Sequence, residues 1–304
     1  MKRILSVLLI LCLLSVGFGC APKEHSVVGY CFDTVITITA ACSQEVLDGA
    51  LALCQKYDTL FDRTDPDSEV WKLNHSLGAP TVVSEDTAFV LNLANEMYQK
   101  SGGAFDITVA PVTALWDFHS ETPTPPNPET LKRAVSLVNG SCVEVSGTTV
   151  TLKEGVTIDL GGIAKGFVAD RVKSYLLEQG CVSACINLGG NVLTIGGKPN
   201  GEAWRVGIRD PKGGPNDVVE VLSVTDRAVV TSGTYERCFS YEGTFYHHIL
   251  NPETGMPVQR ETTSVTIVAE SAAIADALST ACFVLDEQAA GMLARSYEAK
   301  IIYH

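Results

Sequence analysis

The residues best placed to do chemistry form the run Asp-Leu-Gly-Gly-Ile-Ala-Lys-Gly at 159–166, directly ahead of an amphipathic stretch. Residues 156–159 predict a short buried strand. Two glycines then let the backbone approach a ligand, with amides and carbonyls that neither strand nor helix consumes. Lys165 falls on the first turn of the next helix, where free amides and the helix dipole favour an anion. The run indicates a polyphosphate site. It lacks P-loop spacing, and a tight strand-to-helix turn with an exposed lysine is the alternative.

A second chemical pattern lies near the end of the chain, in the predicted helix 271–283. Asp276 and Thr280 are four residues apart and therefore share one helical face. Their neighbours are Ala, Ile and Leu, so we expect the pair to point into the protein, where an unpartnered carboxylate is costly. Mg²⁺ would take the carboxylate and the hydroxyl as oxygen ligands. The alternative is a Thr280 hydroxyl bonded back to the Asp276 carbonyl, with the carboxylate capping a loop.

Two further runs carry polar or aromatic groups. At 246–255 the residues 251–255 predict a turn, and His247 and His248 lie on opposite faces if the preceding strand continues. At most one of these histidines then faces a site, and lone strand histidines are more often structural or surface groups. At 102–111, Phe105 and Asp106 suit stacking on and hydrogen bonding to a planar ring, although the run also reads as a helix stop and a strand.

The overall charge excludes one class of partner. The 304-residue chain carries 22 Lys and Arg against 35 Asp and Glu, a formal charge of −13. Nucleic acid is not expected as a partner, because phosphate backbones require clustered Lys and Arg. An anionic substrate must therefore be held by local amides, a lysine or a metal ion rather than by the global field.

The N-terminus predicts export. Lys2 and Arg3 form a basic region, residues 4–16 are apolar but short for a membrane span, and small residues surround Cys20. This resembles a bacterial lipoprotein signal at residues 1–19, with an ordinary secretory signal as the alternative. In the favoured interpretation Cys20 is diacylated, residues 20–26 form a tether, and a domain at 27–304 is anchored to the cell membrane, facing outside the cytoplasm. The eight cysteines beyond Cys20 are expected to be buried free thiols.

The elements that must position these residues mix helices and strands without repeats. The pattern predicts an α+β fold with largely antiparallel sheets and packed helices. The expected elements are a long strand at 27–40, helices at 43–61, 84–100 and 164–179, short strands from 180 to 268, helices at 271–283 and 287–297, and a closing strand at 299–303.

Taken in order, these runs resemble the ApbE-type FAD:protein FMN transferases, and the resemblance covers essentially all of the chain beyond the signal. The runs that carry it are Phe32-Asp-Thr-Val-Ile-Thr-Ile38, Asp67-Ser-Glu-Val70, Gly103-Ala-Phe-Asp-Ile-Thr-Val-Ala-Pro111, Asp159-Leu-Gly-Gly-Ile-Ala-Lys-Gly166, Asn187-Leu-Gly-Gly-Asn191, Ser232-Gly-Thr-Tyr-Glu-Arg237, His248-Ile-Leu-Asn-Pro-Glu-Thr-Gly255 and Ala275-Asp-Ala-Leu-Ser-Thr280.

The resemblance implies a fold, a site and a reaction. It implies two subdomains with the flavin between them, and Mg²⁺-dependent transfer of FMN from FAD to a threonine of an exported acceptor protein, releasing AMP. The acceptor is typically a subunit of a redox-driven membrane complex. Mg²⁺ ligands fall on Gly162, Asp276 and Thr280. FAD contacts fall on Phe32, Ala104, Phe105, Asp106, Asp159, Lys165 and Leu250.

The catalytic roles follow from this reaction. Lys165 is expected to be an electrostatic clamp on the phosphates, and His248 the base for the acceptor hydroxyl, with Asp276 as the rival base. Two other functions stay open at this point. One is a Mg²⁺-dependent FAD pyrophosphatase, in which water replaces the threonine and FMN and AMP are released. The other is a non-catalytic flavin-binding lipoprotein, which the intact Asp276 and Thr280 pair disfavours.

Overall fold

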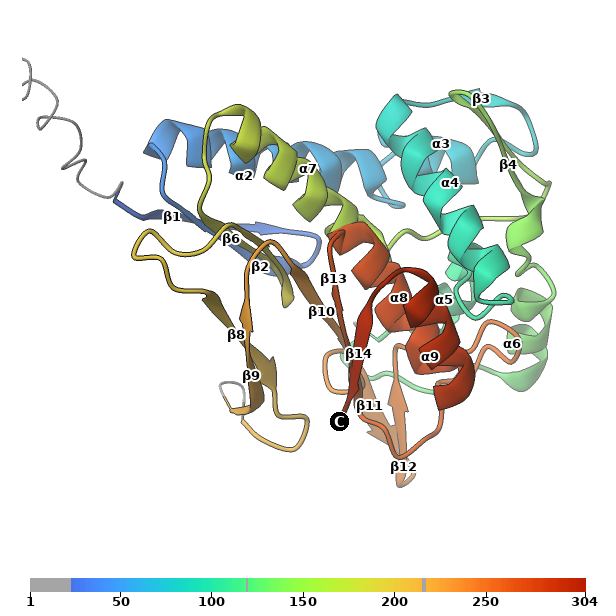
Figure 1. The fold of residues 1–304 in the computed structure, drawn as a ribbon. Coiled ribbons are helices and arrows are strands. Elements are labelled where there is room, and N and C mark those ends of the chain that lie inside the picture. The colour runs from blue at the N-terminus through green and yellow to red at the C-terminus, as the bar shows by residue number, and fades with distance from the viewer. Residues whose placement is uncertain (1–22, 119, 215–216) are drawn as a thin grey trace, which may run out of the picture.

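The computed structural model describes residues 23–118, 120–214 and 217–304, so the predicted signal and Cys20 lie outside the described residues. Within those ranges no helix combines the length and hydropathy needed to cross a membrane. The core is a seven-stranded sheet in the order β1-β2-β6-β7-β10-β13-β14 (Figure 1). Every neighbouring pair runs antiparallel, which confirms the predicted α+β class. The strands are β1 (His25–Cys31), β2 (Thr34–Ala40), β6 (Ala184–Leu188), β7 (Asn191–Ile195), β10 (Ala228–Gly233), β13 (Ser264–Ala269) and β14 (Lys300–Tyr303).

The first two strands are a hairpin, so the prediction of one long strand at 27–40 is wrong. The chain reverses at Phe32 and Asp33, whose φ angles are 53° and 56°. Two positive φ values in a two-residue loop match the twist of the flanking strands, but Asn-Gly is the usual sequence and Phe-Asp gives no such signal. A bulky residue in the left-handed region is unusual. It is held there partly by Asp58, whose Oδ1 accepts the Phe32 amide at 2.8 Å.

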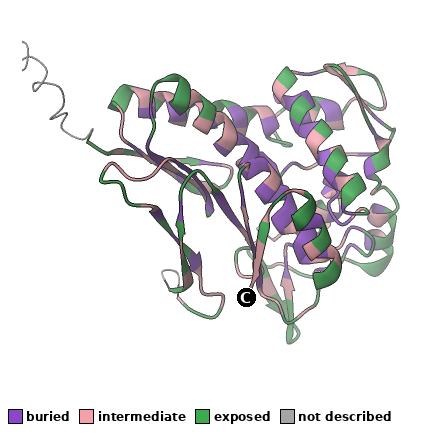
Figure 2. Cartoon of the chain, viewed as in Figure 1, coloured by how far each residue is buried: buried purple, intermediate pink, exposed green. Residues whose placement is uncertain are grey.

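Helices cover one face of this sheet, and the predicted helices are confirmed to within a residue or two. They are α2 (Gln44–Phe61), α7 (Ala164–Glu178), α8 (Ala272–Val284) and α9 (Glu287–Ser296). Ser43 caps the N-terminus of α2 and Ser271 that of α8, each through its side-chain oxygen. Buried residues of the helices and strands face one another between the two layers (Figure 2). The rings of Tyr57, Phe61 and Phe167 pack together, Tyr57 stacked on Phe61 and edge-on to Phe167.

A smaller helical part lies beside the large sheet and shares its hydrophobic core. Two short segments here were predicted as strands. Residues 107–109 instead form a 3₁₀ helix, and residues 156–159, all of them described, join no sheet. The elements are α3 (Glu69–Asn74), α4 (Glu85–Lys100), α5 (Ala110–Trp116), α6 (Pro128–Val135), a second 3₁₀ turn (Gly140–Cys142) and a three-stranded sheet of β3 (Thr81–Val82), β5 (Thr149–Leu152) and β4 (Val143–Ser146).

Two hairpins complete the fold. The hairpin β8 (Trp204–Arg209) and β9 (Val218–Val224) packs on the face of the large sheet opposite the helices, with Trp204 against Val192 and Val229 in one cluster. The hairpin β11 (Cys238–Tyr241) and β12 (Thr244–His247) leads directly into His248 and is therefore the element that positions it.

Helices α7 and α8 lie side by side (Figure 1) and approach so closely that only glycine fits at the crossing. A Cβ added to Gly166 would stand 2.2 Å from the carbonyl oxygen of Ala272 and 2.7 Å from Cβ of Asp276. The same approach brings the Gly166 amide to Oδ2 of Asp276 at 2.9 Å. A carboxylate of α8 therefore caps the N-terminus of α7, whose own N-cap residue, Ile163, makes no side-chain cap bond.

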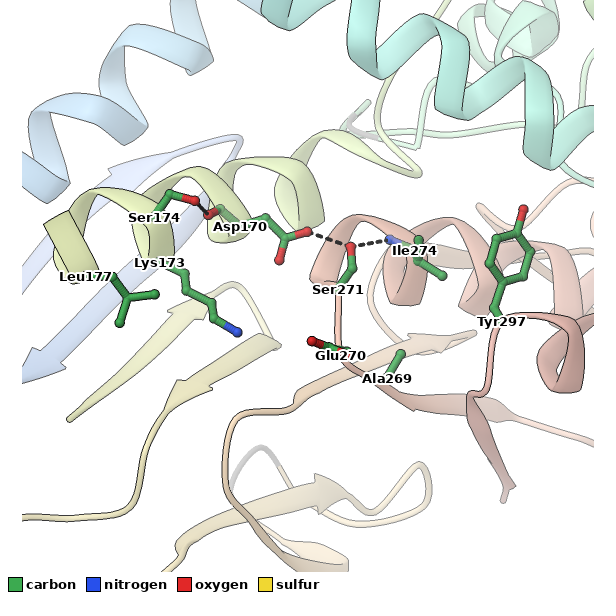
Figure 3. A pocket seen from close by; sticks show the side chains of 9 residues that line it. All are labelled: Asp170, Lys173, Ser174, Leu177, Ala269, Glu270, Ser271, Ile274 and Tyr297. Atoms are coloured by element: carbon green, nitrogen blue, oxygen red, sulfur yellow. Dashed lines mark hydrogen bonds between the residues drawn. The ribbon is translucent and has the colours of Figure 1, made fainter. Parts of the chain in front are cut away.

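Asp170 of α7 in turn caps the N-terminus of α8. Asp170 of α7 accepts hydrogen bonds from the Ser271 hydroxyl at 2.7 Å and from the amides of Ala272 and Ala273 at 2.9 and 3.0 Å (Figure 3). Each helix thus supplies the carboxylate that satisfies the first amides of the other. The two caps fix the position of each helix along the other, and the close approach at Gly166 fixes the distance between them.

Gly166→Ala should lower the free energy of unfolding by about 1–3 kcal/mol, because the methyl group has no room against the α8 backbone. Gly291→Ala, in the middle of α9, is the matched control: its added Cβ meets only the flexible end of Arg295, at 3.4 Å. The control should be neutral or stabilising by up to ~1 kcal/mol, because alanine favours helix. Urea unfolding of both variants measures this, and equal stabilities would contradict the close crossing.

Candidate active site

The glycine turn and α8 meet at the predicted metal ligands. A Cβ on Gly162 would lie 3.5 Å from Oγ1 of Thr280 and 3.1 Å from Cε2 of Phe105, so these three predicted site residues are neighbours. The Ser279 hydroxyl donates to the Asp276 carbonyl at 2.8 Å, and the Ser232 and Ser279 hydroxyls lie 2.7 Å apart. Because the Ser279 hydroxyl already donates its proton to the Asp276 carbonyl, Ser232 is the donor in the bond between the two serines. The bond back to the Asp276 carbonyl is thus made by Ser279 rather than by Thr280, and among the described residues the Thr280 hydroxyl lies nearest the hydroxyl of Ser232, at 3.5 Å.

Asp276 is buried, with 4% of its surface exposed, and within the described residues one of its two carboxylate oxygens, Oδ2, accepts a hydrogen bond, from the Gly166 amide. A buried carboxylate with spare acceptor capacity beside a free hydroxyl and an open turn is an all-oxygen donor set, which suits Mg²⁺ and leaves positions for substrate oxygens. In the part of the chain that the structure describes, no three His, Cys, Asp or Glu side chains cluster as metal ligands. The predicted set needs no such cluster, since it holds one carboxylate, one hydroxyl and one backbone group.

The cations Lys165 and Arg237 lie on the same side of the site as His248. The Lys165 ammonium donates to the carbonyl of Gly161 at 3.3 Å, which holds it over the turn. His248 continues the β11–β12 ladder, its amide donating to the Arg237 carbonyl at 3.0 Å. Burial and then the charge of Arg237 lower the pKa of His248 to about 3, with a further contribution from Lys165. The ring remains partly accessible, yet its Nδ1 is enclosed and has no hydrogen-bond partner among the described residues.

The neighbouring histidine has a structural role, as the alternating-face argument allowed. His247 is 3% exposed, and its Nε2 lies 2.8 Å from the Val258 carbonyl while its Nδ1 accepts the Ile249 amide at 3.3 Å. These partners fix a neutral ring with the proton on Nε2. Burial also lowers the pKa of His247. Of the two histidines, only His248 has a ring nitrogen left for a substrate.

Asp159 anchors the start of the glycine turn to the smaller part of the fold. Its amide donates to the Ile107 carbonyl and its Oδ1 accepts the Gly161 amide, both at 2.8 Å. Its Oδ2 lies 3.5 Å from both Nε of Arg63 and the hydroxyl of Thr113. The carboxylate thus organises the turn and ties it to α5.

The run from Ala104 to Asp106 lines the same region but is mostly internal. Phe105 is 3% exposed, so only a ring edge reaches the turn. Both oxygens of Asp106 are occupied: Oδ1 accepts the amide and hydroxyl of Thr108, at 2.8 and 2.6 Å, and Oδ2 accepts the Gly140 amide at 2.9 Å. Burial raises the pKa of Asp106, and these hydrogen bonds oppose the rise. Its visible role is to shape the loop that presents Ala104 and Phe105.

The remaining predicted contacts lie at two borders of the site. Phe32 sits at the strained hairpin turn, and its neighbour Asp33 pairs with Arg237 at 3.7 Å, which links this turn to the His248 strand. Leu250 is buried in a second cluster with Val112 and Trp116 of α5. Contacts therefore run from the Phe32 turn through Asp33 and Arg237 to His248, while Leu250 packs against α5.

A hollow of about 400 Å³ lies elsewhere, at the N-terminus of α8 (Figure 3). Lys173, Glu270, Ile274 and Tyr297 are among the side chains that line it. It contains none of the predicted site residues. The site is defined by convergent polar groups around the glycine turn rather than by this hollow.

Two residues of the site region gave no signal in the sequence. Arg63 and Thr113 approach Asp159 from α2's end and from α5, 96 and 46 residues away along the chain. Asp170, which caps α8, is likewise 101 residues from Ser271. Each looks like an ordinary helix or loop residue locally, and only the contact across the fold assigns its role.

The His248 ring should show no titration between about pH 5 and pH 8, and Arg237→Ala should raise its pKa by removing a cation. Because the folded pKa of about 3 lies below the unfolded value of 6.5, the unfolded state binds the proton first. Protonation of His248 therefore favours the unfolded state, and the free energy of unfolding decreases as pH falls from 6.5 to about 3. Ring resonances followed by NMR across the pH range test this, and a midpoint near the unfolded value would contradict the burial argument.

Comparison with known proteins gives a consistent picture. The sequence profile of the ApbE family matches residues 32–303. The FAD:protein FMN transferase of Treponema pallidum is 37% identical over 275 residues, which cover 85% of this chain and 76% of that protein. The enzyme of the same name from Klebsiella pneumoniae is 32% identical over 237 residues, with 77% and 73% covered.

Solved structures agree with the fold. The crystal structure of the ApbE protein from Thermotoga maritima superposes with a TM-score of 0.85 at 33% identity, covering 92% of this chain and 94% of that one. The flavin transferase ApbE from Vibrio cholerae gives 0.82 at 26% identity, covering 92% and 93%. The matched region holds the glycine turn, the Asp276 helix and the His248 strand together, and the chain belongs to the ApbE family of flavin transferases.

Proposed function

We propose that this chain transfers FMN from FAD to a threonine hydroxyl of an exported acceptor protein, with release of AMP. The observation that carries the proposal is the convergence of three groups on one glycine turn. These are the half-satisfied buried carboxylate of Asp276, the ammonium of Lys165 and the neutral, unpartnered imidazole of His248. Metal ligand, phosphate clamp and base are the groups that phosphoryl transfer at a pyrophosphate requires.

The oxygen donors around the glycine turn are the reason for including a divalent cation in the proposed reaction. Asp276, Thr280 and the backbone of Gly162 would hold Mg²⁺, and its chemistry there is to offset the charge that develops on the departing AMP phosphate. Asp276 is oriented for this by the Gly166 amide, which fixes one carboxylate oxygen at 2.9 Å and leaves the other free. Ser232 supports Thr280 from the neighbouring strand β10.

The pyrophosphate side of FAD fits the N-terminus of α7. This helix has no side-chain cap of its own on Ile163, and its first turn carries Lys165. The Ala164 amide is bonded to the Leu160 carbonyl and the Gly166 amide to Asp276, so the Lys165 ammonium and the positive end of the helix dipole are the groups that attract phosphate oxygens. The whole chain is acidic, so this local arrangement rather than the overall field provides the attraction.

Proton transfer is assigned to His248. The threonine oxygen attacks the phosphorus on the FMN side, the bond from that phosphorus to the bridging oxygen breaks, and AMP leaves with the electron pair. The threonine proton moves to the His248 ring, which is neutral in the absence of substrate. A bound pyrophosphate would raise its basicity, because opposite charge favours the protonated form. Asp276 is the weaker candidate, since its carboxylate is already committed to the α7 amide.

The location of the protein belongs to the same proposal. We infer that Cys20 is lipidated and that the domain is tethered at the outer side of the cytoplasmic membrane, where exported acceptor proteins are found. The first strand, β1, begins at His25, five residues after that cysteine. Such a short tether keeps the site close to the membrane and to acceptors embedded in it.

The test is an incubation of the purified protein with FAD, Mg²⁺ and a domain bearing a candidate acceptor threonine. Intact mass of the acceptor and released AMP are measured together. An FMN-sized mass gain matched by AMP supports the transferase. FMN and AMP free in solution would make the protein an FAD pyrophosphatase, and FAD bound but unchanged after several acceptors would make it a flavin carrier.

Asp276→Asn should separate the catalytic and structural roles of this residue. The amide oxygen can still accept the Gly166 amide, so the variant should stay folded, but the lost charge should reduce transfer by roughly 10²-fold or more. Asp276→Ala removes both functions and should also lower Tm. Single-turnover transfer and thermal unfolding, measured side by side, check this. Full activity in the Asn variant would remove Asp276 from the site.

His248→Gln should lower the rate of transfer by about 10²- to 10⁴-fold while FAD binding changes little, because the amide cannot take the proton. His247→Gln is the control for disturbance of the strand and should affect stability more than rate. FAD affinity by fluorescence and transfer rate at saturating FAD provide the two readouts. A loss confined to FAD affinity would assign His248 to binding instead.

A further inference from the structure

Two cysteines meet at the end of the large sheet where α2 begins and α7 ends. Strands β2 and β6 pair with Ala40 opposite Ala184, and one step further the Ala41 amide donates to the Ser183 carbonyl at 2.9 Å. Cys42 follows Ala41 directly, and Cys181 lies two residues before Ser183. Continued by one residue, this pairing places Cys42 opposite Val182 and therefore beside Cys181, whose side chain acts directly on the Cys42 thiol.

Cys181 is held firmly in this place. It follows Gly180, which has a φ of 77°, and its amide donates to the Leu176 carbonyl at 2.9 Å. This is the bond that closes a helix through a left-handed glycine, so the end of α7 fixes the backbone of Cys181. Its thiol, 1% exposed, donates to the Ser183 carbonyl at 3.4 Å.

The Cys181 thiol lies close enough to Cys42 to affect its ionisation. The pKa of Cys42 is raised to about 11, first by burial and then by the charge and hydrogen bonding of Cys181. Since the Cys181 thiol donates to a carbonyl, its sulfur is left as an acceptor toward Cys42. Cys42 is only partly buried, so a solute can reach this member of the pair.

The other cysteines offer no equivalent arrangement among the described residues. Cys31 and Cys54 also influence each other, but both are buried, at 1% and 0% exposure, and neither gives a reagent access. Cys185 is partly buried on the same sheet and points to the face beside Val192, in the cluster under the β8–β9 hairpin. Cys238 is exposed on β11 at the opposite side of the molecule from α2 (Figure 1).

We propose that Cys42 and Cys181 are a built-in disulfide site, formed by exchange with a low-molecular-weight disulfide. The Cys42 thiolate attacks one sulfur of that disulfide and expels one small thiol, leaving a mixed disulfide on Cys42. The Cys181 thiolate then attacks Sγ of Cys42 and expels the second small thiol. The protein loses two hydrogens, and the small disulfide is reduced to two thiols.

The bond would serve stability rather than catalysis. It joins the segment before α2 to the C-terminal end of α7, and it closes a loop of about 140 residues, which restricts the unfolded chain strongly. The candidate active site lies at the other, N-terminal end of α7, so the crosslink leaves Lys165 and the glycine turn in place. Nothing here stabilises a thiolate, in contrast to strongly oxidising disulfides, so the bond should persist once it is made.

The experiment starts from the full chain, fully reduced and kept in mild detergent. The reductant is removed and oxidised glutathione is added at mildly alkaline pH, where the raised pKa of Cys42 still permits exchange. Proteolysis and mass spectrometry identify the linked peptides, and Tm is measured for reduced and oxidised protein. Cys181→Ser removes the partner, and Cys185→Ser is the matched control on the same sheet.

A peptide pair linked through Cys42 and Cys181 is expected, with Tm raised by roughly 10 °C and FMN transfer unchanged. Cys185→Ser should give the same link and the same shift, and Cys181→Ser neither. Repeating the exchange in urea should give a mixture of pairings, because the selectivity comes from the fold. A folded wild-type protein that carries only mixed disulfides with glutathione, or a link between other cysteines, would overturn the proposal. Neither result would bear on the proposed transferase function.

Discussion

The close crossing of α7 and α8 is the constraint on which the rest of the site depends. Its cause is the missing side chain at Gly166, which lets the α8 backbone come within contact of α7. At that distance Asp276 caps α7 and Asp170 caps α8, so two carboxylates that would be costly if buried alone become the means of holding the helices in register. A charge-assisted hydrogen bond contributes roughly 1.5–3 kcal/mol when buried. Losing one cap therefore affects both the stability of the crossing and the position of the site.

The same crossing sets the chemistry. It places Thr280 one helical turn beyond Asp276, against the turn at Gly162, so that oxygen donors from two distant segments converge. The cations come from separate segments, Lys165 on α7 and Arg237 directly before β11. Burial of the His248 ring, and after it the charge of Arg237, lowers its pKa and keeps the ring neutral. In this acidic protein the cations of the site are few and local, so any attraction for an anion arises there rather than from the overall field.

Several departures from the sequence-based expectations occur at or beside this site. The long strand expected at 27–40 is interrupted at Phe32. Residues 156–159, also expected as a strand, join no sheet, and the Asp159 amide instead donates to the Ile107 carbonyl. Both segments look like strands because their side chains alternate or are apolar, and both are diverted by contacts with remote parts of the chain. The Phe32 turn in particular has unfavourable backbone angles for its sequence, and such strain is most often found where a fold positions a ligand.

The sequence by itself determined the α+β class, the helices α2, α4, α7, α8 and α9, and the family through its sequence motifs. It did so because helical periodicity, N-cap residues and glycine turns act over a few neighbouring residues. It also placed Asp276 and Thr280 on one buried face. Only the tertiary structure decided that Asp276 caps α7, that Asp170 caps α8, that Asp106 is occupied by the loop it shapes, and that His248 rather than His247 is left with a free nitrogen. Each of these depends on a contact between segments far apart in the chain, whose relative placement is set by packing and which no local pattern records.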